Sequence, residues 1–105
     1  MKKAKKFDDG KPGFSNLPRL ALLECAKVMT FGAKKYGKFN YSKGIELTRL
    51  TDALERHLNS YLTGEDIDES KHSHLAHIAC NALMLLDSEL TGQLIDDRNK
   101  IYKQK

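Results

Sequence analysis

The sequence lacks any apolar run approaching the roughly 20 residues that a membrane-spanning helix needs. Lysines follow Met1, but no apolar segment of the kind found in secretory signal peptides comes after them. We therefore expect a cytoplasmic protein that does not bind membranes. The sequence has only two cysteines, Cys25 and Cys80. Both lie in apolar helical patterns, which favours buried, reduced thiols over a disulfide.

Alternation of apolar and polar residues, the pattern of a half-buried strand, is also missing, and no segment is repeated. Tryptophan is absent, and proline occurs only twice. With 40% hydrophobic and 30% charged residues, the composition is typical of a soluble globular protein rather than a disordered one. We therefore interpret residues 1–105 as a single all-α domain, a usual length for one domain.

A basic surface is missing from the middle of the chain, although the net charge is +4. Residues 1–11 carry +3 and residues 96–105 carry +2, so the stretch between them carries −1. We interpret residues 1–16 and 96–105 as basic, solvated tails. This distribution argues against a nucleic-acid-binding face, and it leaves only salt-sensitive contacts of the tails as a route to nucleic acid.

What the sequence does contain is apolar residues at helical spacing in three segments, residues 18–37, 46–62 and 73–92. Pro18 suits the first turn of the first helix, because its missing N–H would be unpaired there anyway. Ser73 is a typical N-cap for the third. These features predict three main helices packed as a bundle.

A short fourth helix, or a charged extension, is expected for residues 92–105. The third helix is apolar around much of its circumference, which requires packing neighbours on several sides. We therefore expect a homo-oligomer that completes the helical bundle. A monomer with an unusually buried central helix is the alternative.

Polar side chains interrupt this apolar helix at His74, His77 and Asn81, whose spacing places them on one helix face. If the second and third helices pack antiparallel, His57 approaches the same end of the bundle, beside the acidic loop that contains Asp68. Imidazole and carboxylate groups that converge in this way can bind a divalent metal. A hydrogen-bonded polar layer that fixes the helix register is the alternative. His72 is expected in the loop, outside this stripe.

Cations and aromatic residues gather around the turn between the first two helices, where Lys35, Tyr36 and Asn40 lie, and Arg56 precedes His57. Such groups suit a nucleotide, because cations bind phosphate and aromatic rings stack on bases. An ordinary exposed loop is the alternative interpretation.

Four blocks carry a resemblance to a known family: "KFDDGKPGFSNLP", "VMTFGAKKYGKFNYSKG", "ERHLNSYLTGEDID" and "SHLAHIACNALML". Together they resemble a small, largely phage-encoded family described as dATP/dGTP diphosphohydrolase N-terminal-domain proteins. The resemblance runs in order from about Lys6 to Leu85. It implies hydrolysis of a purine deoxynucleoside triphosphate to a monophosphate and pyrophosphate, with a divalent metal.

The family is similar in style to the all-α NTP pyrophosphohydrolases, which are helical oligomers that bind magnesium through Glu-x-x-Glu and Glu-x-x-Asp pairs. The comparable places here read Asp52-x-x-Glu55 and His74-x-x-His77. Besides magnesium or manganese, the histidines make cobalt or zinc suitable metals.

The resemblance and the residue chemistry together imply roles for individual side chains. The expected metal ligands are His57, Asp68, His74 and His77. Either Glu65 or Asp68 would accept the proton of the attacking water. Phosphates would be bound by Lys11, Lys35 or Arg56, and the base or sugar by Tyr36, Asn40 or Asn81. The alternative function is a helical oligomer that binds or sequesters a nucleotide without cleaving it.

Overall fold

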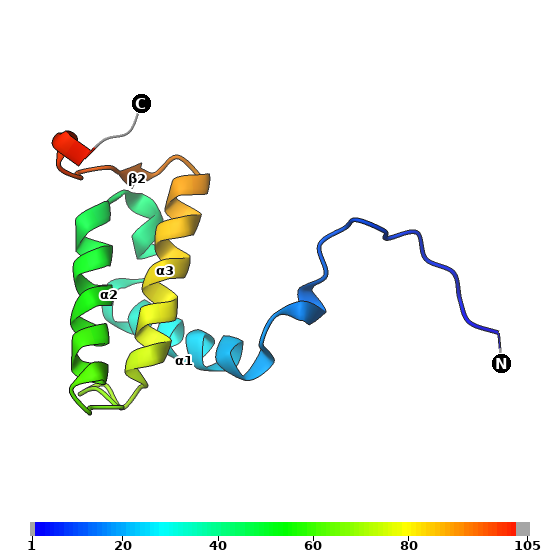
Figure 1. The fold of residues 1–105 in the computed structure, drawn as a ribbon, viewed down its shortest axis with the longest axis horizontal. Helices are drawn as coiled ribbons and strands as arrows, with labels where there is room; N and C mark the ends of the chain where they lie inside the picture. The colour runs from blue at the N-terminus through cyan, green and yellow to red at the C-terminus, as the bar shows by residue number, and fades with distance from the viewer. Residues whose placement is uncertain (1, 103–105) are drawn as a thin grey trace.

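The computed structural model describes residues 2–102, and the chain is mostly helical (Figure 1). The three main helices are α1 (Arg19–Tyr36), α2 (Leu47–Leu62) and α3 (His74–Leu90). Each begins and ends within two residues of its predicted bounds, so the prediction of three helices is confirmed. The remaining elements are short: 3-10 helices at Phe14–Asn16, Asn40–Lys43 and Lys100–Tyr102, and strands β1 (Ile45–Glu46) and β2 (Leu94–Ile95).

Helices α2 and α3 lie antiparallel and side by side, joined by the loop of residues 63–73, while α1 packs across α3 (Figure 1). A small apolar core lies between α1 and α3, where Cys25 and Val28 contact Ala76 and Cys80. Leu50 of α2 is the other buried apolar residue within residues 2–102. The antiparallel hairpin brings the end of α2 and the start of α3 together beside the loop.

The prediction of an all-α fold without strands is wrong in one respect, because β1 and β2 form a parallel pair that joins Ile45 to Leu94 and Glu46 to Ile95. Strands of two residues are too short to show an alternating pattern in the sequence. The pair ties the residues after α3 to the residues before α2.

The predicted fourth helix is reduced to the 3-10 turn at Lys100–Tyr102, and the alternative of a charged extension describes residues 96–99 better. Asp97 explains why: its carboxylate accepts a hydrogen bond from the Thr48 backbone N–H at 2.9 Å and another from the Thr48 hydroxyl. Asp97 therefore accepts from an N–H group at the start of α2 that has no partner within that helix, instead of continuing a helix of its own. Residues 103–105 of the predicted tail lie outside the described residues.

The prediction of buried, reduced cysteines is confirmed. Cys25 and Cys80 are both free thiols, and the Cys80 thiol donates a hydrogen bond to the Cys25 carbonyl oxygen at 3.3 Å. Burial, with a contribution from Cys25, raises the pKa of Cys80 to about 12. The Cys80 thiol therefore acts as a small apolar core residue rather than as a nucleophile.

Many large apolar side chains stay on the surface of the described chain. On α1 and α3 the exposed leucines are Leu20, Leu23, Leu75, Leu83, Leu86 and Leu90. No helix within residues 2–102 has both the length and the apolar character needed to cross a membrane. The helices of a single chain therefore leave much of their apolar surface without a packing partner.

Ser73 is the N-cap of α3, as predicted: its hydroxyl oxygen accepts hydrogen bonds from the backbone N–H of Leu75 at 3.1 Å and of Ala76 at 3.3 Å. We expect Ser73→Ala to lower the free energy of unfolding by about 1 kcal/mol. For a chain of this size, that loss lowers Tm by roughly 4–8 °C in thermal unfolding followed by circular dichroism. Ser73→Asp, which keeps an acceptor at the cap, should retain the wild-type Tm, and an equal loss in both variants would contradict the capping role.

Candidate metal centre

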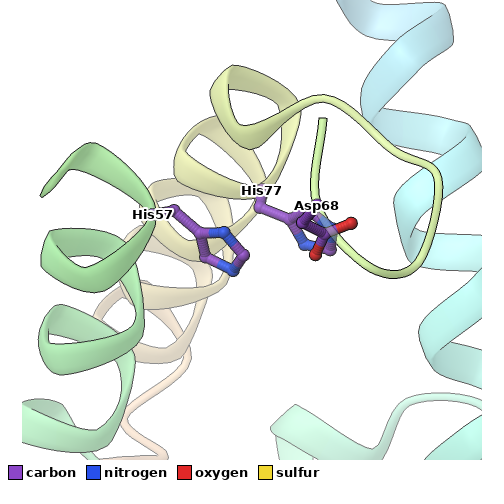
Figure 2. A group of neighbouring side chains, drawn as sticks. All are labelled: His57, Asp68 and His77. Carbon is purple, nitrogen blue, oxygen red and sulfur yellow. The ribbon is translucent and has the colours of Figure 1, made fainter. Parts of the chain in front are cut away.

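Three side chains from different elements converge at the loop end of the helical hairpin: His57 of α2, Asp68 of the loop and His77 of α3 (Figure 2). Each offers one ligand atom, and the three atoms all lie within 4.8 Å of one another. The His57 and His77 rings are stacked, with centroids 4.3 Å apart. Three of the four residues predicted to bind metal therefore lie together, and we call them the triad.

The loop holds Asp68 in place through its own backbone. Asp68 N–H donates to the His72 carbonyl oxygen at 3.0 Å, and His74 N–H donates to the Asp66 carbonyl oxygen at 2.9 Å. Lys71, with a φ of 69°, supplies the left-handed turn between these contacts, and its N–H donates to the Asp68 carbonyl oxygen at 3.0 Å. The Asp68 carboxylate is therefore directed toward α3 by a folded loop.

Ser70 links the triad to the rest of the loop. Its hydroxyl contacts the Asp68 carboxylate and lies 3.1 Å from both His72 Nδ1 and His77 Nε2. Asp68 Oδ2 also lies 3.0 Å from His77 Nε2. Ser70 was not predicted from the sequence, although its position two residues after an aspartate is typical of the turn in which Asp68 accepts the Ser70 N–H at 2.9 Å.

The protonation states of the triad suit metal binding. Burial lowers the pKa of His57, and the neighbouring His77 and His74 lower it further. Burial also lowers the pKa of His77, against the opposing effect of Asp68. For Asp68, burial acts to raise the pKa, but hydrogen bonds from Ser70 and the charge of His77 outweigh it, so the pKa is lowered overall. At neutral pH the triad therefore presents two uncharged imidazoles and one carboxylate.

A donor set of two imidazoles and one carboxylate fits a divalent transition metal. Imidazole suits zinc, cobalt and manganese, whereas magnesium prefers oxygen ligands throughout. Metal ligands must also be deprotonated, and the directions of the three pKa shifts favour that state. The residues that could hold the ion are thus His57, Asp68 and His77.

His74, the fourth predicted ligand, lies beside the triad and has both ring nitrogens engaged. Its Nδ1 is 2.8 Å from His57 Nδ1, and its Nε2 is 2.6 Å from Glu65 Oε1. The His74 side chain is only 4% exposed, whereas the Glu65 side chain is 60% exposed. Glu65, predicted as a proton acceptor, therefore contacts the triad through His74.

The residues predicted to bind the nucleotide are spread over the molecule. Lys11 lies in the exposed N-terminal segment, and Asn40 begins the 3-10 turn after α1. Lys35 Nζ lies 5.1 Å from the ring centroid of the exposed Tyr36.

Arg56 and Asn81 have other surroundings. Arg56 lines a cavity of about 470 Å³ with Asp52, Glu55 and two neighbouring polar residues of α2. Asn81 is buried, and its amide donates to the His77 carbonyl oxygen at 2.8 Å. That amide is therefore used within its own helix, one turn from the triad.

A groove of about 490 Å³, which was not predicted from the sequence, lies between α1 and the loop. Its lining comprises Leu23, Ala26, Lys27, Thr30, Phe31, Lys34 and His72. The Phe31 and His72 rings have centroids 5.3 Å apart, and Ser70 connects His72 to the triad. The sequence signal was the position of Lys27, Phe31 and Lys34 on one face of α1. The groove therefore places aromatic and cationic side chains next to the candidate metal centre, with His72 and Ser70 between them.

Comparison with known families gives a match over residues 1–98 to the family described as "dATP/dGTP diphosphohydrolase, N-terminal". A protein of Salmonella phage PMBT28 named dATP/dGTP diphosphohydrolase is 35% identical over 81 residues. That similarity covers 77% of this chain but 28% of the phage protein, so the chain spans less than a third of its relative. No solved structure matches the chain.

Proposed function

Because this chain belongs to the dATP/dGTP diphosphohydrolase N-terminal family, we propose that it hydrolyses a purine deoxynucleoside triphosphate, with a divalent metal, to the monophosphate and pyrophosphate. The observation that supports this proposal most directly is the convergence of His57, Asp68 and His77. The base and the reaction come from the name of a relative that is much longer than this chain.

The triad residues would hold the ion through two imidazole nitrogens and one carboxylate oxygen. When bound, a divalent metal supplies charge neutralisation at phosphate oxygens and makes a water molecule a stronger nucleophile. In the proposed reaction the water oxygen forms a bond to the α-phosphorus, and the bond from that phosphorus to the bridging oxygen breaks. Pyrophosphate leaves, and the water's proton passes to a carboxylate, for which Asp68 and Glu65 are the nearby candidates.

The groove beside His72 is the proposed place for the nucleotide. Phe31 and His72 offer aromatic faces on which a purine can stack, and Lys27 and Lys34 offer positive charge for phosphates. Lys27 already pairs with Glu24 at 2.8 Å, as its spacing suggests, so Lys34 is the better candidate for phosphate. The other candidates for nucleotide contact are the residues predicted from the sequence: Lys11, Lys35, Tyr36, Asn40, Arg56 and Asn81.

Substitutions of two adjacent lysines can show whether the phosphates bind in the groove or at the turn after α1. We expect Lys34→Ala to raise KM for the nucleotide about 10-fold with little change in kcat, because a charge-assisted contact to phosphate contributes about 1.5 kcal/mol. Lys35→Ala is the matched control, since it removes the same charge from the next residue, which does not line the groove. The measurement is steady-state kinetics on both variants, and a larger KM effect for Lys35→Ala would place the phosphates at the predicted turn instead.

We also propose that a second copy of the chain completes the bundle. Within residues 2–102 only five apolar residues are buried, whereas the leucines of α1 and α3 named above remain exposed. A core this small is marginal for a domain of about 100 residues, and exposed apolar surface of this extent marks an interaction site. Analytical ultracentrifugation should give a mass of at least two chains, and a mass of one chain would contradict the proposal.

The test of the proposed function is product analysis. The purified protein is incubated with each nucleoside and deoxynucleoside triphosphate, with magnesium, manganese, cobalt, zinc or a chelator, and the products are resolved by chromatography. Metal-dependent release of dAMP or dGMP with pyrophosphate is the expected result. Nucleotide-induced thermal stabilisation without product would instead identify a non-catalytic nucleotide-binding protein.

A further inference from the structure

We propose that Glu65 and His74 hold the His57 imidazole in one tautomer, with the proton on Nδ1 and the free lone pair on Nε2, where the metal binds. This inference rests on the proposed metal site. It gives Glu65 and His74 positioning roles, in place of the proton-acceptor and ligand roles predicted for them from the sequence. Of the two carboxylates named above as candidate proton acceptors, it leaves Asp68.

Glu65 sets the direction of the hydrogen bonds, because its ionised carboxylate can only accept them. The 2.6 Å contact between Glu65 Oε1 and His74 Nε2 therefore requires that His74 Nε2 carries a proton and donates it. The inference assigns His74 this one proton, which leaves its Nδ1 with a lone pair. His74 can then act only as an acceptor toward its other neighbour.

That other neighbour is His57, whose Nδ1 lies 2.8 Å from His74 Nδ1. Because His74 Nδ1 accepts, His57 Nδ1 must donate, and the single proton of the neutral His57 ring is placed there. A histidine that binds a metal carries one ring proton at most, and the contact with His74 places that proton of His57 on Nδ1. Its Nε2 therefore holds the lone pair that a metal requires.

The packing of the two rings holds their nitrogens in place for these hydrogen bonds. The His74 side chain is 4% exposed, and the His74 backbone N–H is bound to the Asp66 carbonyl oxygen, so the ring is held between Glu65 and His57. The His57 ring is parallel to the His77 ring within 1°. Outer partners of this kind orient a histidine ligand, and their removal typically costs roughly 10- to 100-fold in metal affinity or activity.

The first measurement is the tautomer of each histidine, read from long-range ¹H–¹⁵N correlation spectra of the metal-free protein at neutral pH. The expected result is a proton on Nδ1 of His57 and on Nε2 of His74. A proton on Nε2 of His57, or on both nitrogens of His74, would overturn the inference. Because this spectrum needs neither metal nor substrate, its outcome does not depend on whether the protein is an enzyme.

The second measurement uses Glu65→Gln, a change at an exposed side chain that keeps its size. An amide can donate as well as accept, so it no longer forces His74 Nε2 to donate. We expect His57 to show a mixture of tautomers and the Kd for Mn²⁺, measured by titration, to rise roughly 10- to 100-fold. Asp66→Asn is the matched control: it removes the same charge one residue along and keeps the backbone carbonyl that accepts from His74.

The outcomes separate the positioning role from its competitors. If Glu65→Gln abolishes turnover but leaves the His57 tautomer and the Mn²⁺ affinity unchanged, Glu65 is the proton acceptor and the inference is overturned. If Asp66→Asn weakens Mn²⁺ binding equally, loop charge explains the effect and the inference is again overturned. A wild-type protein with the expected tautomer and tight Mn²⁺ binding, but without product, would support the inference while contradicting the proposed hydrolysis.

Discussion

Asp68→Asn is expected to lower metal-dependent hydrolysis by more than about 100-fold while leaving the helical content unchanged. Loss of an outer partner of a metal ligand already costs roughly 10- to 100-fold, and loss of the only carboxylate in the triad should cost more. Asparagine has nearly the same shape and can still accept the hydrogen bonds from Ser70 that shape the loop. The measurement is kcat/KM at saturating metal, with circular dichroism to check the fold.

Glu69→Gln is the control for this experiment, because Glu69 is the next residue, is exposed, and loses the same charge. It should keep wild-type kinetics, because the Glu69 side chain is exposed and does not belong to the triad. Wild-type activity in the Asp68→Asn variant would show that this carboxylate is not needed for the reaction. The acidic loop would then have no catalytic role through Asp68.

Metal binding should raise the thermal stability of the protein strongly. At a free metal concentration 100-fold above its Kd, binding to the folded state alone contributes about 2.7 kcal/mol. For a chain of this size that corresponds to a rise in Tm of roughly 10–20 °C. The physical reason is that residues 57, 68 and 77 converge only in the folded chain. Differential scanning fluorimetry with Mn²⁺, Co²⁺ and Zn²⁺ measures the rise, and a chelator should reverse it.

The variant His57→Ala tests whether that rise comes from the triad. It keeps Asp68 and His77 but removes one of the three ligands, so most of the rise in Tm should be lost. A rise as large as that of the wild type would show that the ion binds elsewhere on the protein, for example at the carboxylates of Asp52 and Glu55.

The helices could be predicted from the sequence because their signals are local. In α3, apolar spacing marks the body of the helix and Ser73 marks its start. In α1, the glycine that follows Tyr36 marks the end of the helix. The β1–β2 pair could not be predicted, since it depends on residues about 50 positions apart and only two residues long on each side. Asp97 gave no local sign that it would cap a helix that begins so far away.

The sequence predicted which residues lie at the candidate site better than it predicted how they are arranged there. Helical spacing and an antiparallel hairpin were enough to place His57 and His77 together. The same spacing put His74 on their face, but it could not show that the ring would be buried and engaged by Glu65. The part played by Ser70 depends on the turn that the loop adopts, which no spacing rule describes.

The residues that would do the chemistry and those that would choose the nucleotide belong to separate parts of the chain. The triad lies wholly within the α2–loop–α3 hairpin, a span of 21 residues (Figure 2). Every residue that lines the groove except His72 comes from α1. If the proposed function holds, substitutions in α1 would change which base or sugar fits and leave the proposed metal ligands untouched. A family built in this way would then acquire new nucleotide preferences in small evolutionary steps, with the proposed metal ligands kept at every step.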